Sequence, residues 1–211
     1  MKKLTGKLTN RVLRMGALLA LPLISLEALA SGDSYVGAKA GWVYSHDACE
    51  GQATSCDDES TGGGMFVGYQ VNDWLALEVG YDDLGTITAD YPALEQPDVN
   101  AHYKGEMQGF ELTAKPYWNV NENVTLFTKL GTLAWSMDVT GDEVGFKHSA
   151  SDDDWSLLLG VGAEYVLSSN WSALFEYQWV DNLGGSSTGG TDVSMVSVGL
   201  VYHFGSSEVQ P

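Results

Sequence analysis

The chain has 211 residues and a formal net charge of −18, with 28 acidic residues against 10 basic ones. Five of the basic residues but only one acidic residue lie within residues 1–30, so loss of that segment would change the net charge to −22 and leave no arginine. Nucleic-acid binding requires basic patches that neutralise phosphates, and it is therefore excluded as a function.

The first thirty residues have the pattern of a secretory signal peptide. Basic residues from Lys2 to Arg14 precede an apolar run at 15–26, and Ala28-Leu29-Ala30 follows it. The run is too short for a spanning helix and ends in small residues, so we expect cleavage after Ala30. No later stretch has 18 consecutive apolar residues. The exported chain is therefore either soluble outside the inner membrane or crosses a membrane with strands.

Alternation of side-chain character with a period of two predicts transmembrane strands. Each alternating segment is roughly ten residues long, which is what a tilted strand needs to cross a bilayer. An even number of strands allows an antiparallel barrel to close with both ends on one side. We expect eight strands, at 34–44, 63–71, 74–84, 105–118, 123–137, 154–166, 171–181 and 194–204.

The connections between these segments alternate in length. Those at 72–73, 119–122 and 167–170 are short, whereas those at 45–62, 85–104, 138–153 and 182–193 are long. Short turns on one side and long loops on the other are typical of outer-membrane barrels. The pattern predicts an all-β, eight-stranded, antiparallel up-and-down transmembrane barrel with four extracellular loops.

The two faces of the strands differ in a way that favours a membrane barrel over a soluble one. In segment 154–166, one face runs from Trp155 through leucines and valine to Tyr165, and the other carries glycines and Glu164. Apolar faces with aromatic ends suit lipid and its two interfaces. A soluble barrel such as a lipocalin would point its apolar face inward and scatter charges over the other face. Here charges occur singly near mid-strand, which favours membrane insertion.

Alternate residues of a strand face opposite sides of the sheet. If the apolar face is turned toward lipid, six charged side chains point into the barrel. An eight-stranded barrel is just wide enough for its side chains to fill, and unpaired charge there is costly. We therefore expect an interior salt-bridge network that closes the lumen. An ion path gated by exchange of partners is the alternative, and catalysis by paired carboxylates is a remote third. The network residues are Lys39, Glu78, Lys115, Lys129, Glu164 and Glu176.

Cys49 and Cys56 are the only cysteines, and both lie in the first predicted loop of an exported chain. An oxidising compartment favours a disulfide between them. The alternative is a metal-binding pair, but a four-ligand site would need further ligands, and no pair of histidines lies nearby. We therefore expect a disulfide, no metal and no cofactor.

Signals for catalysis or ion binding are weak elsewhere. The four histidines are single, and neither an HExxH nor a GxSxG pattern occurs. The acidic runs 57–59 and 152–154 could bind a divalent cation through carboxylate oxygens, although such runs are more often solvated loops. The scattered histidines do not supply the rim cluster that an outer-membrane enzyme would need, so we expect no enzymatic activity.

Short motifs along the chain make it resemble one known family. They occur in order and cover almost all of the chain after residue 30: YVGAKAGW at 35–42, GYQVN at 68–72, EVGYD at 78–82, LTAK at 112–115, TKLG at 128–131, GAEY at 162–165, EYQW at 176–179 and VYHFG at 201–205. Together they resemble the N-terminal transmembrane barrel of the OmpA family.

The resemblance implies the same interior network and a terminal-strand signal at Tyr202 and Phe204. The family prototype has arginine at the positions of Lys129 and Leu174, and leucine at the second removes a partner of the carboxylate at Glu78, so we do not expect the family's gating mechanism here. We expect a signal peptide at 1–30, a barrel at 31–205 and a short tail at 206–211, without the family's peptidoglycan-binding domain.

The function expected from the resemblance is that of a structural and interaction barrel in the outer membrane of a Gram-negative bacterium, with a role in membrane integrity, adhesion or reception. The alternative is a narrow, low-conductance porin for small ions or solutes. Expected partners are outer-membrane lipid, lipopolysaccharide and the barrel-assembly machinery, and phage or host surface molecules at the loops.

Overall fold

The computed structural model describes residues 33–46, 48, 53–92, 100–143, 146–185 and 188–205. The predicted signal peptide at 1–30 and tail at 206–211 lie outside them. Almost all of the described residues lie in strands. These are β1 (Ser34–His46), β2 (Ser55–Asp57), β3 (Glu59–Asn72), β4 (Leu75–Pro92), β5 (Asn100–Asn121), β6 (Val124–Glu143), β7 (Phe146–Val166), β8 (Trp171–Gly185) and β9 (Gly189–His203).

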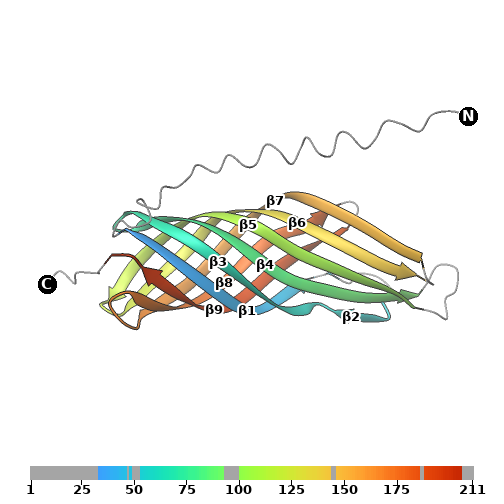
Figure 1. Ribbon diagram of the computed structural model, residues 1–211, viewed down its shortest axis with the longest axis horizontal. Helices are drawn as coiled ribbons and strands as arrows, with labels where there is room; N and C mark the ends of the chain where they lie inside the picture. Colours follow the sequence, from blue (N-terminus) through green and yellow to red (C-terminus); the bar gives the residue numbers. More distant parts are fainter. Residues whose placement is uncertain are drawn as a thin grey trace, which may run out of the picture.

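Eight of these strands close into a barrel (Figure 1). From β3 to β9 each strand pairs with the next, β1 pairs with both β3 and β9, and every pairing is antiparallel. The short β2 lies outside the ring and pairs with β4 alone among the described strands. The predicted eight-stranded up-and-down barrel is confirmed.

Among the described residues, no helix is long and apolar enough to cross a membrane.

The outside of the barrel carries a band of exposed apolar side chains between aromatic residues. On β7, Trp155 is 62% exposed and Tyr165 is 53% exposed, and leucine and valine side chains alternate between them. Ten residues at about 3.3 Å per residue, tilted by about 40°, span about 25 Å, which matches the apolar band of outer-membrane barrels. Exposed apolar area of this extent would be unfavourable in water, and it suits lipid.

Inside the barrel, buried apolar side chains form two layers. The turn-side layer lies near the short turns and contains Tyr35, Phe66, Ala76, Phe127, Leu174 and Val201. The loop-side layer lies toward the opposite end and contains Val43, Leu84, Ile87, Met107, Leu133, Trp135, Met137, Leu158, Val180, Leu183, Val193 and Met195. Every strand of the ring except β3 contributes to the loop-side layer, so its side chains meet across the lumen.

Glycines make room for the large rings of the turn-side layer. A Cβ added at Gly68 would lie 2.1 Å from the Tyr35 ring, and one added at Gly37 would lie 2.2 Å from Phe66. In both cases the ring belongs to the residue directly opposite on the paired strand. Any larger residue at these two positions would displace the aromatic ring from the lumen.

The predicted strand bounds on the loop side are wrong, because much of the four segments expected to be long loops is strand. β6 continues to Glu143 and β7 begins at Phe146, so 138–153 is almost entirely a hairpin, and most of 85–104 and 182–193 is also strand. The apolar lipid face ends near the bilayer boundary, but antiparallel hydrogen bonding continues beyond it. A search for apolar alternation therefore ends the strands too early. The end of the last strand also differs slightly, at His203 instead of 204.

A β-bulge in β4 changes which side chains point inward near the loop side. The register of β4 shifts between Asp83 and Thr86, where Gly85 has a φ of 76° and donates its N–H to Asp83 Oδ1 at 2.9 Å. Leu84 and Ile87 are therefore both buried although they lie three residues apart. A strict period of two places Ile87 outside, so sequence alternation alone does not predict this part of the interior.

Candidate functional site in the barrel interior

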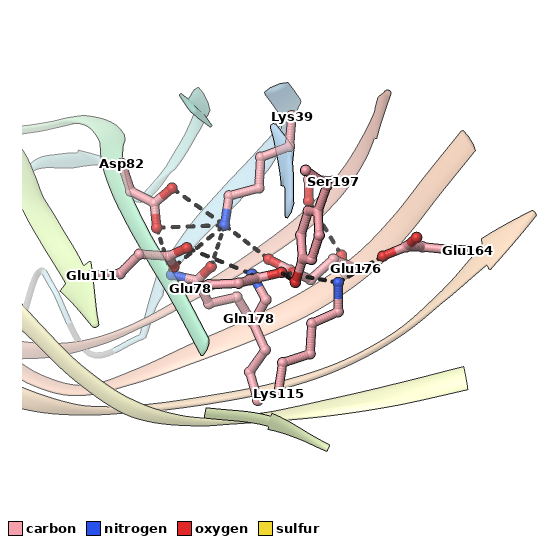
Figure 2. A network of polar contacts seen from close by, with 11 residues as sticks. Lys39, Glu78, Asp82, Glu111, Lys115, Glu164, Glu176, Gln178 and Ser197 are labelled. Carbon is pink, nitrogen blue, oxygen red and sulfur yellow. Dashed lines mark hydrogen bonds and ion pairs between the residues drawn. The ribbon is translucent and has the colours of Figure 1, made fainter. Parts of the chain in front are cut away.

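The structure places all six predicted interior residues in the lumen and brings them together. Each is at most 8% exposed, and they come from six strands of the ring. Figure 2 shows most of this group, with carboxylates and ammonium groups converging between the strands. The group lies between the two apolar layers and is called the charged layer below.

Glu176 on β8 bridges two lysines. Its Oε1 lies 2.8 Å from Lys39 Nζ, and its Oε2 lies 2.8 Å from Lys129 Nζ. Lys129 also lies 2.6 Å from Glu78 Oε2, so one ammonium group on β6 joins carboxylates from β8 and β4. All four side chains are 1% exposed or less. Short charge-assisted contacts at full burial fix the rotamers of these side chains.

Lys115 continues the sequence of contacts toward the short turns. Its Nζ lies 2.9 Å from Glu78 Oε1 and 2.6 Å from Glu164 Oε1. Glu164 also approaches His203, with 3.6 Å between Oε2 and Nε2. Opposite charges therefore alternate along the lumen, in the order Asp82, Lys39, Glu176, Lys129, Glu78, Lys115 and Glu164.

Aromatic rings of the turn-side layer also contact the ammonium groups. Lys115 Nζ lies 4.4 Å from the centroid of Phe127, and Lys129 Nζ lies 5.0 Å from that of Phe66. The hydroxyl of Tyr35 donates to Glu78 Oε1 at 2.7 Å. The charged and apolar layers are therefore joined, since ring faces attract cations most strongly where water is excluded.

Sequence reasoning missed three polar members of the charged layer. Asp82 Oδ1 lies 3.2 Å from Lys39 Nζ, and Gln178 accepts from Lys39 at 2.6 Å while donating to Asp82 at 2.9 Å. Glu111 is 1% exposed and lies beside Lys39 and Lys129 at 3.7 and 3.5 Å. Each lies an even number of residues from a predicted interior residue on the same strand and therefore faces the same side. Applying the period of two along the whole strand would have predicted all three.

These additions correct the expected charge balance of the interior. Three lysines and three glutamates were expected, but five carboxylates share the layer with Lys39, Lys115 and Lys129, because Asp82 and Glu111 are buried as well. Glu111 has the weakest contacts of the five. Neither of its oxygens has a hydrogen-bond partner among the described residues, and its two ion-pair distances are the longest to any lysine.

Leu174 occupies the position where the family prototype has arginine. It lies directly opposite Glu164 in the β7–β8 pairing and packs in the turn-side apolar layer, 3% exposed. It cannot pair with a carboxylate. Lys115 and His203 are the partners of Glu164 instead.

The remaining predicted site residues that the structure describes lie at the two ends of the barrel. Tyr202 stacks edge-on against Trp171 and Phe204, with ring centroids 5.1 and 5.2 Å away. Phe204 N–H donates to Ser34 O at 3.0 Å, where the last strand meets the first. Cys56 lies in β2, and no described cysteine is free. Cys49 lies outside the described residues, so its pairing stays a prediction.

The arrangement is suited to closing the lumen. Within the part of the chain that the structure describes, no three histidine, cysteine, aspartate or glutamate residues are grouped closely enough to hold a metal ion. The carboxylates of the charged layer are buried beside lysines, and apolar side chains enclose the layer at both ends. A substrate would have to displace one of these layers before it reached them.

Comparisons with known proteins agree with this architecture. Residues 30–208 match a family described as OmpA-like transmembrane domain. Outer membrane protein A of Yersinia pseudotuberculosis is 33% identical over 207 residues, covering 91% of this chain and 54% of that protein. Outer membrane protein A of Escherichia coli O157:H7 is 34% identical over 180 residues, covering 84% of this chain and 49% of that protein.

The chain thus spans about half the length of these curated relatives. Among solved structures, the crystal structure of Neisserial surface protein A superposes with a TM-score of 0.55 at 16% identity, covering 82% of this chain and 97% of that chain. At that level of identity the superposition shows a shared fold.

Proposed function

Because the chain belongs to the family of OmpA-like transmembrane domains and is an outer-membrane β-barrel of a Gram-negative bacterium, we propose that it acts as a closed structural and interaction barrel. In this role the transmembrane part anchors the protein in lipid, and the loop side contacts molecules outside the cell. An enzymatic role is not proposed.

The observation that carries the proposal is the order of layers in the lumen. The charged layer is held between an apolar layer at the loop side and another at the turn side. Ions cross apolar constrictions poorly because they lose hydration there without replacement. A barrel filled in this way holds its shape and leaves its outer ends for contact.

Conductance across a planar bilayer tests whether the barrel is closed. We expect the refolded protein to insert and to give no openings above leak. A variant with Trp135→Ala and Met107→Ala shortens two buried side chains of the loop-side layer and serves as the matched control for a breached layer. Its folded state is checked separately by the shift in gel mobility on boiling.

Stepwise openings of the unaltered protein would contradict the closed barrel and support the second candidate, a narrow low-conductance porin. One observation favours that candidate. The alternating charges extend from Asp82 to Glu164, which provides exchangeable partners along the lumen. The five carboxylates against three lysines predict that such a pore would prefer cations.

The loop side is the proposed site for partners outside the cell, which include lipopolysaccharide and phage or host surface molecules. The described residues on that side form hairpins that extend beyond the aromatic boundary, and exposed acidic side chains such as Asp138, Asp153 and Asp154 lie on them. Tyr202 and Phe204 at the other end are the proposed signal for the barrel-assembly machinery.

A disulfide between Cys49 and Cys56 is proposed for the loop-side end. β2, which contains Cys56, pairs with β4 beyond the β4 bulge and outside the ring. A ring closed by so few residues removes at most about 2 to 3 kcal/mol of chain entropy, so Cys56→Ser should change barrel stability little. Thiol titration of protein isolated from the envelope should find no free thiol, and two titratable thiols would contradict the pairing.

A further inference from the structure

The strand β7 has an open edge where it projects from the barrel. Its pairing with β6 runs without a register shift from Tyr165 to Phe146, but its pairing with β8 ends at Leu158. Residues 146–157 are therefore hydrogen-bonded to a neighbouring strand on one side only, within the described residues. In Figure 1 the β6–β7 hairpin extends farther toward the right-hand end than β8 does.

A bulge in β8 creates this opening. The β8–β9 register shifts between Val180 and Leu183, and Asn182 there has a φ of 45°. Its N–H is taken by Asp192 Oδ1 at 2.9 Å, and its carbonyl accepts from Ser156 Oγ at 3.2 Å. The end of the β8–β9 hairpin thus contacts β7 through side chains and forms no backbone ladder with it.

The β6–β7 hydrogen bonds show which backbone N–H groups of β7 point toward the open edge. Val166 N–H donates to Asn123 O on the β6 side, and N–H directions alternate along an antiparallel strand. Odd-numbered residues of β7 therefore turn their N–H groups toward the open edge. Trp155 agrees with this, since its N–H is taken by the side chain of Asp154 at 2.9 Å instead of by a strand. Ser149, Ser151 and Asp153 present theirs outward.

The edge is also acidic. Asp152, Asp153 and Asp154 are consecutive, and the last two are exposed. Asp152 accepts from Thr188 at 3.0 Å. Among the described residues, no lysine or histidine forms an ion pair with Asp153 or Asp154. Trp155 and Leu157 belong to the lipid-facing band, so the part of the edge at 146–154 lies outside the membrane.

We propose that this edge of β7 is a docking strand for an extended cationic segment of another protein. The partner adds a strand to the β4–β7 sheet through backbone hydrogen bonds, and basic side chains opposite Asp153 and Asp154 provide selectivity. Exposed edges with free N–H and C=O groups are templates for strand addition. The proposal deepens the interaction role proposed above and rests on it.

The test uses refolded protein in uncharged detergent and a fluorescent peptide of about ten residues, long enough to lie along the edge. The peptide alternates threonine and valine around three consecutive lysines. We expect saturable binding by fluorescence anisotropy, and no binding of the same peptide with a methylated backbone, which cannot form the ladder. Equal binding of the two peptides would overturn strand addition.

Two variants locate the binding. Ser151→Pro removes an edge-facing N–H without removing a bond to β6, since proline is tolerated where the N–H faces solvent, and it should abolish binding. The double change Asp153→Asn and Asp154→Asn should weaken binding about fivefold, as expected for two exposed ion pairs.

The matched control for the double variant is Asp138→Asn with Asp142→Asn on β6, which removes two exposed charges away from the open edge. If both doubles weaken binding equally, general attraction explains it and the assigned edge is wrong. If the aspartates only protect the edge from self-association, their removal should cause aggregation without loss of peptide binding, which also overturns the proposal. Conductance of the same preparations reports separately on barrel closure.

Discussion

Lys129 illustrates how the interior of this barrel is determined by single residues. It is fully buried, contacts Glu78 and Glu176 within 2.8 Å, and lies over the ring of Phe66. A cation so enclosed is stable only because carboxylates from two other strands replace its water. The same reasoning applies to each lysine of the charged layer, so the loss of one partner leaves buried charge without compensation.

Lys115→Met should therefore lower the free energy of unfolding by about 3 to 5 kcal/mol, because it leaves Glu78 and Glu164 without their shared partner. Lys104→Met is the matched control, since the same change there breaks an exposed pair with Glu106 and should cost at most about 1 kcal/mol. Urea unfolding in lipid vesicles measures both. Equal losses would mean that water solvates the interior charges. Adding Glu164→Gln to Lys115→Met should restore part of the loss.

Glu111 should behave in the opposite way to Glu176, although both are buried glutamates. Glu176→Gln weakens the closest carboxylate contacts of Lys39 and Lys129 and should cost about 3 kcal/mol or more. Glu111→Gln removes one of two excess negative charges and breaks no hydrogen bond, so stability should stay the same or rise. The same unfolding assay compares the two variants. A large loss for Glu111→Gln would show that its charge is required.

At the scale of strands, period-two alternation was sufficient to predict the ring and its membrane-spanning parts. It predicted all six lysines and glutamates of the original interior set, because each alternates with lipid-facing apolar residues. It did not predict the strand extensions such as 100–104 of β5, where the outward face carries His102 and Lys104 in place of apolar residues. It also could not place Ile87, because the bulge at Gly85 shifts the parity of β4. Bulges and ladders beyond the bilayer depend on pairing partners, which the sequence of one strand does not contain.

The pairing of glycine with an aromatic ring across β1 and β3 leads to a prediction at this scale. Gly68→Ala would place a methyl group against the Tyr35 ring and disturb its hydrogen bond to Glu78, so stability should fall by about 1 to 3 kcal/mol. Gly105→Ala is the matched control, because the nearest atom to its added Cβ is the flexible end of Met137, at 3.1 Å. Urea unfolding should show a clear loss for the first variant only. Similar losses of stability in both variants would mean that the Tyr35 ring can move to accommodate the added methyl group.

At the scale of the whole molecule, closure of the ring separates two regions with different stability. Between the short turns and Leu158, every strand of the ring is paired on both sides and filled by three interior layers. Beyond Leu158 the backbone ladder between β7 and β8 ends, the β8–β9 hairpin contacts β7 only through side chains among the described residues, and β7 has an open edge. The part of the ring between the short turns and Leu158 should unfold as a unit. The projecting hairpins can exchange their amide hydrogens without opening the ring.

Closure also predicts heat-modifiable migration on gels. A ring without edges cannot fray strand by strand, so the folded barrel should persist in cold SDS and migrate differently from the boiled chain.

Lys115→Met should keep this shift when unboiled but lose it at a lower temperature, because the ring is intact and only the interior is weakened. Ser151→Pro should keep the shift up to the same temperature as the unaltered protein, since its effect is confined to the edge above Leu158. The measurement is a temperature series of unboiled samples on one gel. A monomer that stays soluble without detergent and migrates identically before and after boiling would contradict the inserted, closed barrel. Loss of the shift in Ser151→Pro would mean that the projecting hairpin and the ring unfold together.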